Sequence, residues 1–281
     1  MLRKTIALAA LGLAVFATPA LAASSHPLEP KEMTWGFEGP FGKFDQAQLQ
    51  RGYKIYREVC SACHSMELMS FRNLGQKGGP FYDPKYPNPN DNPYVKAIAK
   101  DYQINDIDSE TGDVIQRPGT SADRFPNPFP NEPAARASNG GALPPDLSNM
   151  AKARDGGPRY IYSLLTGFVE PPEGLTVPNG QHYNPYMAGD VSAYYKGKHH
   201  VPPGGFLAMA PPLATDKVSF DDGTKSTVEQ QAKDVTAFLT WASEPKMEER
   251  KAFGIAAIIY LLILSGILYV SYKRIWRNVS H

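Results

Sequence analysis

Cysteine is scarce in this sequence, with only two among 281 residues. Two thiols are too few for a multi-disulfide scaffold, or for a site in which four cysteines hold zinc or an iron–sulfur cluster. Net charge is also small, because 29 Lys and Arg against 28 Asp and Glu leave a formal charge of +1. The chain therefore lacks the broad cationic surface that binds a phosphate backbone, and we expect no nucleic acid among its partners.

Glycine and proline, by contrast, are abundant, at 24 and 26 residues. The 42% of hydrophobic residues still suffices for at least one sizeable core. Twelve of the prolines lie between Gln76 and Pro145, where they disfavour helices and central strands. We therefore expect a mainly α-helical domain with extensive irregular loops, in which residues 76–145 form a long irregular excursion.

The N-terminus has the features of an export signal. Arg3 and Lys4 precede an apolar run from Ile6 to Phe16, and an Ala-x-Ala pattern ends at Ala22. A basic start, a short apolar stretch and small residues, in this order, are typical of a cleaved signal peptide. We therefore expect cleavage after Ala22 and export of the remaining chain.

The C-terminus has the features of a membrane anchor. The stretch from Ala252 to Tyr272 contains no charged residue, and about 20 such residues are needed to cross a bilayer as a helix. Lys273, Arg274 and Arg277 follow it, and positive charge after a span places that end in the cytoplasm. The predicted organisation is a signal peptide at 1–22, a periplasmic domain at 23–248, and at 249–281 a single-pass anchor in the cell inner membrane with a short cytoplasmic tail.

Three other segments have helical periodicity. The first runs from about Leu49 to Cys63, with apolar residues on one face. The second begins at Pro158, a residue suited to a first helical turn, and ends at Gly167. The third opens with the capping-box pair Ser226 and Glu229 and stops before Pro245.

The motif Cys60-Ser-Ala-Cys63-His64 carries the chemistry. A Cys-x-x-Cys-His sequence is typical of covalent haem attachment: two thiols bind the vinyl groups of one porphyrin, and the adjacent histidine binds the iron. A thioredoxin-like redox pair would need a βαβ setting that the sequence does not show. A zinc site would need two more ligands. The alternative that remains is a disulfide, which the neighbouring histidine disfavours.

The sixth iron ligand decides what a c-type haem does, because an open position suits a peroxidase or gas sensor and a methionine closes it. Met150, Met187 and Met209 are far enough from His64 along the chain to be candidates. Met209 stands out because two prolines that follow it stiffen its segment, and Met187 comes second. His182, His199 and His200 could also bind iron, although surface loop positions explain them as well.

Several blocks of sequence beyond the haem motif resemble the cytochrome c1 family, the membrane-anchored haem subunit of the cytochrome bc1 complex, in its alphaproteobacterial form. The similarity spans almost the whole mature chain. Its blocks are Arg51 to Met66, Arg117-Pro-Gly, Phe125 to Ala137, Gly141 to Ser148, Tyr160 to Gly167, Met209-Ala-Pro-Pro and Phe220-Asp-Asp-Gly-Thr.

This resemblance implies a cytochrome c-like haem domain that holds one haem c. It implies thioether bonds from Cys60 and Cys63 and axial coordination by His64 and Met209. It also implies an arginine, Arg154, near a haem propionate. The residues that would enclose the haem are Asn139, Ala142, Pro144, Pro145, Tyr160, Leu164 and Leu165.

The implied function is one-electron relay, from the Rieske iron–sulfur protein to a soluble or membrane-bound cytochrome c, in the ubiquinol:cytochrome c oxidoreductase. The chain would make or break no substrate bond itself, and quinol chemistry would belong to partners, chiefly cytochrome b. Family analogy suggests a dimeric complex. The alternatives are a membrane-anchored cytochrome subunit of a terminal oxidase, or a haem peroxidase or gas sensor if the sixth position is open.

Two stretches each allow two interpretations. Residues 188–205 form a longer connection than mitochondrial relatives have, and either shield the Met209 segment or contact a neighbouring subunit. The stretch from Asp101 to Asp113 contains five acidic residues and no basic one. Such a stretch could steer a basic cytochrome c by its long-range field, or be an ordinary solvated loop.

Overall fold

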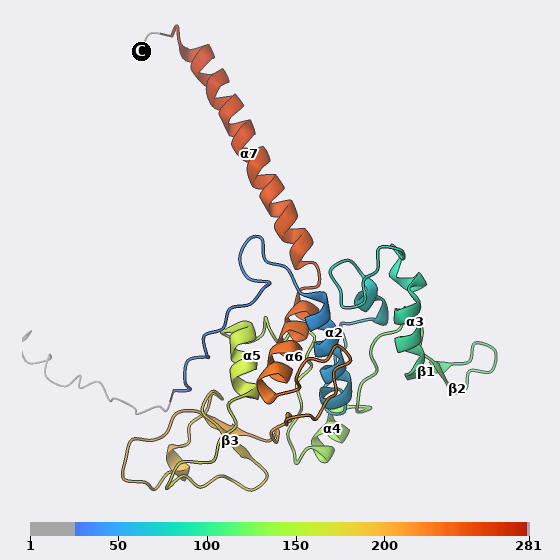
Figure 1. Cartoon of the computed structure of the whole chain (residues 1–281), viewed down its shortest axis with the longest axis vertical. Helices are drawn as coiled ribbons and strands as arrows, with labels where there is room; N and C mark the ends of the chain where they lie inside the picture. Colours follow the sequence, from blue (N-terminus) through green and yellow to red (C-terminus); the bar gives the residue numbers. More distant parts are fainter. Residues whose placement is uncertain (1–25, 280–281) are drawn as a thin grey trace, which may run out of the picture.

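The computed structural model describes residues 26–279, so the predicted signal peptide lies outside the described residues. Helices and irregular loops dominate this part of the chain, and the only regular strands described are four short ones in two antiparallel pairs, which confirms the predicted fold class (Figure 1). The elements are α2 (Gln46–Ile55), η1 (Tyr56–Cys60), η2 (Phe71–Gly75), η3 (Pro89–Asp91), α3 (Pro93–Lys100), β1 (Gln103–Ile107), β2 (Val114–Pro118), α4 (Glu132–Ser138), α5 (Gly157–Leu165), β3 (His182–Asn184), η4 (Ser192–Tyr194), β4 (Gly205–Leu207), α6 (Val228–Ser243) and α7 (Met247–Trp276).

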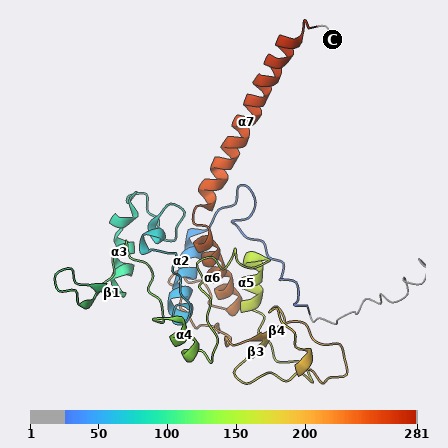
Figure 2. The same ribbon diagram turned by 180° about the vertical axis from the view of Figure 1, so that it is seen from behind.

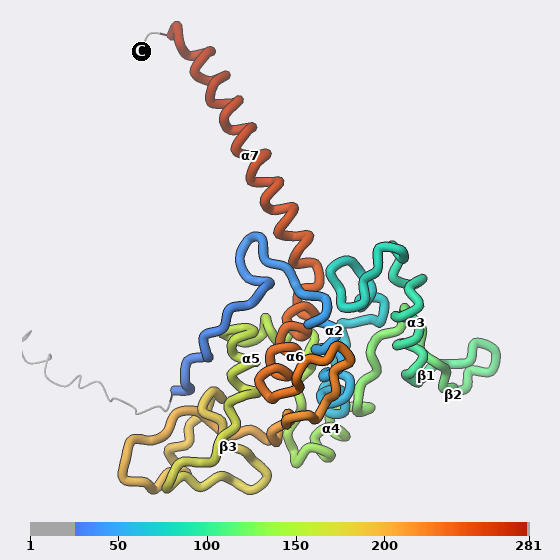
Figure 3. Tube along the Cα trace, viewed as in Figure 1, coloured from blue at the N-terminus to red at the C-terminus, as the bar shows by residue number. Residues whose placement is uncertain are grey.

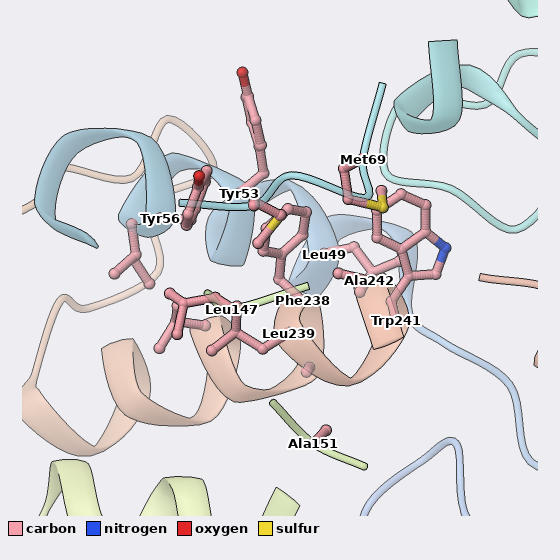
Figure 4. Close-up of a cluster of buried hydrophobic side chains, with 14 of the residues drawn as sticks. Leu49, Tyr53, Tyr56, Met69, Leu147, Ala151, Phe238, Leu239, Trp241 and Ala242 are labelled. Atoms are coloured by element: carbon pink, nitrogen blue, oxygen red, sulfur yellow. The ribbon is translucent and has the colours of Figure 1, made fainter. Parts of the chain in front are cut away.

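The core is built around α2 and α6, which pack side by side (Figure 4). Gly52 allows the close approach, because a Cβ at this position would lie 2.2 Å from the backbone oxygen of Asp234. Aromatic side chains fill the rest of the contact, with the ring of Tyr53 5.7 Å and that of Tyr56 5.8 Å from the ring of Phe238. The end of α2 is thus held rigidly by the core.

An ion pair crosses the same interface. The guanidinium of Arg51 donates to the fully buried carboxylate of Asp234 at 2.7 Å and to Asp222 at 2.6 Å. Gln48 and Gln230 also donate to Asp234, so the buried charge is both paired and hydrogen-bonded. This network joins α2, α6 and the turn before α6.

The predicted helices are found, with two differences. The first begins at Gln46, because Asp45 caps it, and widens into the π turn η1 from Tyr56 onward. The third is capped by Thr227, whose hydroxyl accepts from the backbone N–H of Gln230, so the predicted capping box was misplaced by one residue. The helix predicted from Pro158 is confirmed as α5.

The segment from 76 to 145 is more regular than predicted. It holds α3, α4 and the β1–β2 hairpin, which projects sideways from the body (Figure 1). Proline begins α3 rather than blocking it, because Pro93 occupies the first turn and Asn92 caps the helix with its side chain. The expectation that prolines exclude regular structure was therefore wrong at this helix.

Residues 168–207 form a lobe beside the main body (Figure 3). Strands β3 and β4 pair within it, and Leu175, Tyr183 and Val191 form a small separate core. The long connection at 188–205 belongs to this lobe.

The last helix, α7, extends away from the globular domain (Figures 1 and 2). It has 30 residues, and its apolar window has a mean hydropathy of 2.5 with none of it buried against the protein. By length and composition this helix can span a membrane, as predicted.

Candidate functional site

The Cys-x-x-Cys-His motif lies where α2 ends. Cys60 closes the π turn, and its carbonyl accepts from the backbone N–H groups of Cys63 at 3.1 Å and His64 at 2.9 Å. This tight turn holds all three residues within one short stretch that is anchored to the core through α2. Both cysteines are free thiols, so the alternative of a disulfide is not realised.

Burial and charge give the thiol of Cys60 a distinct environment. Burial raises the pKa of this thiol to about 12, while the nearby ammonium of Lys217 acts in the opposite direction. Burial thus disfavours the thiolate form of Cys60. Cys63 is exposed.

His64 is held as an oriented, neutral imidazole. Burial lowers the pKa of its ring, and Nδ1 lies 2.8 Å from the carbonyl oxygen of Pro145. A carbonyl can only accept, so Nδ1 carries the proton and the lone pair of Nε2 is available to a metal. This is the tautomer that a haem ligand requires.

Asp146 fixes the segment that orients the histidine. Its carboxylate accepts from the hydroxyl of Ser65 and the N–H groups of Glu67 and Ser148, each at 2.8 Å. Burial opposes the charged form, but these hydrogen bonds outweigh it and hold the pKa of Asp146 below its usual value. The N–H of Leu147 adds a bond to the carbonyl of Ser65 at 2.9 Å.

The donor set fits a haem. Two free thiols and an oriented imidazole share one turn, as covalent attachment and axial ligation need. Among residues 26–279 no three His, Cys, Asp or Glu side chains converge as a metal centre, so the zinc interpretation finds no further ligands there.

The predicted haem-enclosing residues lie in two places. One group follows α4: the side chain of Asn139 donates to the carbonyl of Ala135, and its own carbonyl accepts from the N–H of Ala142. Pro144 and Pro145 continue this segment toward the bond with His64. The contacts of Asp146 and Leu147 with Ser65 therefore bring this group to the Cys-x-x-Cys-His turn.

The second group is on α5. Tyr160, Leu164 and Leu165 are each half-buried there, and the hydroxyl of Tyr160 lies 3.7 Å from the sulfur of Met187. Arg154 is exposed just before α5 and donates to the carbonyl of Ala153. Its charge also acts on Tyr160, where it partly offsets the rise in pKa caused by burial.

The candidate methionines are placed differently. Met187 follows β3 and Met209 follows β4, and because Asn184 pairs with Gly205 and His182 with Leu207, the two leave the antiparallel ladder at opposite ends. The sulfur of Met187 already meets the Tyr160 hydroxyl. Met150 packs against the main core. Of the candidate histidines, His182 lies in β3, and His199 and His200 are exposed in the lobe.

Two residues of the site were missed by sequence reasoning. Asp146 holds the turn after His64, and the ammonium of Lys217 donates to the carbonyl of Pro212 at 2.8 Å while acting electrostatically on Cys60. Lys217 is thus bonded to the segment that follows Met209 and is near enough to Cys60 to act on its charge. The only hint of this role in the sequence is that Asp146, whose short side chain can accept from nearby backbone N–H groups, directly follows Pro144 and Pro145.

The acidic stretch is partly neutralised. Asp101 pairs with Arg57 at 2.8 Å and Asp106 with Arg117 at 2.5 Å. Asp108 accepts from the N–H groups of Glu110 and Thr111 within the hairpin turn. Fewer free negative charges are left for steering than the count of five suggested.

The family is shown by comparison with known proteins. A family model described as the Cytochrome C1 family matches residues 35–279. The chain belongs to the cytochrome c1 family. Family membership implies a haem cofactor, which agrees with the donor set at the end of α2.

Relatives from bacteria and fungi support this assignment. Cytochrome c1 of Rhodospirillum rubrum is 39% identical over 98% of this chain and 97% of its own length. The mitochondrial cytochrome c1 heme protein of Saccharomyces cerevisiae is 43% identical over 93% of the chain and 76% of its own length. A cytochrome b/c1 protein of Bradyrhizobium diazoefficiens is 43% identical over 90% of the chain, which spans only 36% of that longer protein.

Proposed function

We propose that this cytochrome c1 family member relays single electrons from a Rieske iron–sulfur protein to a cytochrome c, as the haem subunit of a ubiquinol:cytochrome c oxidoreductase. The observation that carries the proposal is the His64 ring, oriented by the carbonyl of Pro145, beside two cysteines at the end of a core helix. Electron transfer without substrate chemistry would make the chain a subunit of an enzyme complex rather than an enzyme by itself.

The residues that would hold the group are Cys60 and Cys63 through thioether bonds, and His64 and Met209 as axial ligands. When bound, the haem supplies a centre that gains and loses one electron. The chain's own contribution is to keep the imidazole in one tautomer and one orientation through Pro145. A methionine opposite the histidine raises the potential and closes the sixth position to other molecules.

Met209 is the better candidate for that position. The sulfur of Met187 contacts a hydroxyl, whereas Met209 lies in the segment whose Pro212 is tied to Lys217, the cation that also acts on Cys60. This link through Lys217 supports Met209 over Met187 as the sixth ligand.

The remaining residues would enclose the haem and offset its charge. One wall would be the segment after α4, which is joined to the Cys-x-x-Cys-His turn through Ser65 and holds Asn139, Ala142, Pro144 and Pro145. The second wall would be on α5, with Tyr160, Leu164 and Leu165. The side chain of Arg154 is exposed, so its guanidinium could pair with a haem propionate at the protein surface.

The proposed setting follows from the two hydrophobic ends. We infer that a signal peptide at 1–22 exports the domain at 23–248 to the periplasm, and that the anchor at 249–281 leaves the C-terminus in the cytoplasm of an inner-membrane protein. Cytochrome b would be the neighbour in the membrane, and the complex would be dimeric.

Purification of the full-length chain from membranes tests the proposal. We expect the wild-type protein to carry one haem that acidic acetone cannot extract, with its mass raised accordingly. Cys60→Ser and Cys63→Ser should each keep at most one thioether bond, while Ser61→Ala in the same turn should keep both. A colourless wild-type protein, or a haem lost to the solvent, would refute the haem linkage.

A further inference from the structure

A short loop beside the membrane anchor carries an exposed phenylalanine. The loop comprises residues 36–44. Near its ends lie the buried Phe37 and the half-buried Phe44, whose rings are 4.8 Å apart. Between them, at the tip, the side chain of Phe41 is 79% exposed. A single exposed aromatic is ordinary on a protein surface, so what Phe41 can contact depends on where the loop holds it.

The loop is tight because of its glycines. Gly39 has a φ of +72°, which suits glycine, and a Cβ on Gly42 would lie 1.9 Å from the carbonyl oxygen of Glu38. The N–H of Lys43 closes the base of the loop by donating to the carbonyl of Gly36 at 3.0 Å. Phe41 is therefore held at a defined place.

Contacts with the first turns of α7 set the height of the loop. The ammonium of Lys251 donates to the carbonyls of Phe37 at 2.6 Å and Gly42 at 3.2 Å. The N–H of Phe44 donates to the carboxylate of Glu248 at 2.9 Å. Both views of the ribbon show the loop beside the lower turns of α7 (Figures 1 and 2).

These contacts place the loop beside the point where the uncharged run of α7 begins. The charged start of α7 ends at Lys251, and residues 252–272 contain no charge. A lysine at this point extends its ammonium toward the lipid headgroups while its stem lies along apolar surroundings. The carbonyl of Gly42 accepts from that ammonium, and Phe41 directly precedes Gly42. If residues 252–272 cross the bilayer, Phe41 would therefore lie at the level of the headgroups.

We propose that the 36–44 loop is a second membrane contact, in which Phe41 inserts into the lipid surface next to the transmembrane helix. The uncharged part of α7 begins directly after Lys251, and most of its large apolar side chains are exposed, with Phe253 76% exposed. With one contact from the helix and one from the loop, the domain would be fixed in its tilt as well as tethered.

Depth measurement by spin labelling tests this in membranes that contain the assembled protein. Phe41→Cys is labelled with a nitroxide, and its collisions with oxygen, which concentrates in lipid, and with a water-soluble nickel chelate are compared. Val114→Cys is the matched control, because Val114 is 77% exposed at the start of β2, in the hairpin that projects sideways from the body. Phe253→Cys is the lipid reference.

We expect the Phe41 label to collide with oxygen several-fold more often, relative to the nickel chelate, than the Val114 label does. Pro40→Cys, which keeps the phenylalanine, should show the same direction of change. Collisions with nickel as frequent as at Val114 would overturn the proposal, because the loop would then face water. A label shielded from both reagents would overturn it too, because a protein partner would then cover the loop.

Labelling of the wild-type chain provides a separate control. Cys60 and Cys63 cannot react if both are in thioether bonds, so the wild-type protein should remain unlabelled. Labelling of Cys60 or Cys63 would count against the proposed haem linkage. The difference between the Phe41 and Val114 labels would still decide whether the loop contacts lipid.

Discussion

The turn that carries His64 and the segment that carries Met209 are built in different ways. Around His64, the carboxylate of Asp146, the carbonyl of Pro145 and the backbone of Leu147 each make a hydrogen bond across the turn. Around Met209, the strand β4 holds one end, and hydrogen bonds to the carbonyls of Pro212 and Ala214 hold the other. His64 is held at its own position, whereas Met209, the proposed second ligand, is held through the residues on either side of it.

If both residues bind the iron as proposed, this difference means that one ligand is fixed in orientation and the other is adjustable. A braced histidine keeps its tautomer and orientation, which a fixed axial ligand needs. A methionine held by its flanks relies on the stiffness of the prolines after it and on two anchors, Lys217 and Gln231. Changes on the two sides should therefore alter different properties of the haem.

The largest effect is expected from Met209→Leu. Loss of the methionine sulfur would open the sixth position of the iron. The reduction potential should therefore fall by on the order of 100 mV or more, and the ferrous protein should bind carbon monoxide. Redox titration and CO difference spectra measure both. Met187→Leu is the matched control, because its sulfur contacts Tyr160, and it should change neither property substantially. The reverse pattern would make Met187 the ligand.

Features that depend on neighbouring residues in the chain could be predicted from the sequence. The Cys60-to-His64 motif, the helix that ends in it, and the uncharged run of α7 are all local patterns, and the structure has them in place. Proline was a less reliable guide, because Pro93 begins a helix within the segment predicted to be irregular.

Features that depend on tertiary contacts could not be predicted in this way. Asp146 and Pro145 reach the histidine turn across 81 positions of sequence, and no local pattern encodes that pairing. Lys217 looks like an ordinary exposed lysine until the fold brings it near Cys60. The axial role of Met209 was suggested by its prolines and by family resemblance, and it stays a prediction.

A smaller effect is expected from Asp146→Asn on the braced side. The amide removes a negative charge and at least one hydrogen bond from the turn, which weakens the donation of His64 to Pro145 and disfavours the ferric state. The potential should therefore rise, by up to about 40 mV if one hydrogen bond is worth ~1 kcal/mol. Redox titration measures this, and carbon monoxide should still not bind. A fall in potential, or new CO binding, would contradict the assignment of Asp146 to the histidine side.

The smallest change in potential is expected from Gln231→Met on the flank-held side. Gln231 is fully buried, and its amide donates to the carbonyl of Ala214 at 2.7 Å and to Ser226 at 3.0 Å. Loss of a buried hydrogen bond costs ~1 kcal/mol, so transient opening of the methionine segment should become about fivefold more frequent. The rate of CO binding should rise accordingly, while the midpoint potential hardly moves because the closed form still dominates. Ser226→Ala keeps the bond to Ala214 and should leave the CO rate unchanged. An equal rise of the CO-binding rate in both variants would mean that a change in α6, and not loss of the Gln231–Ala214 bond, causes it.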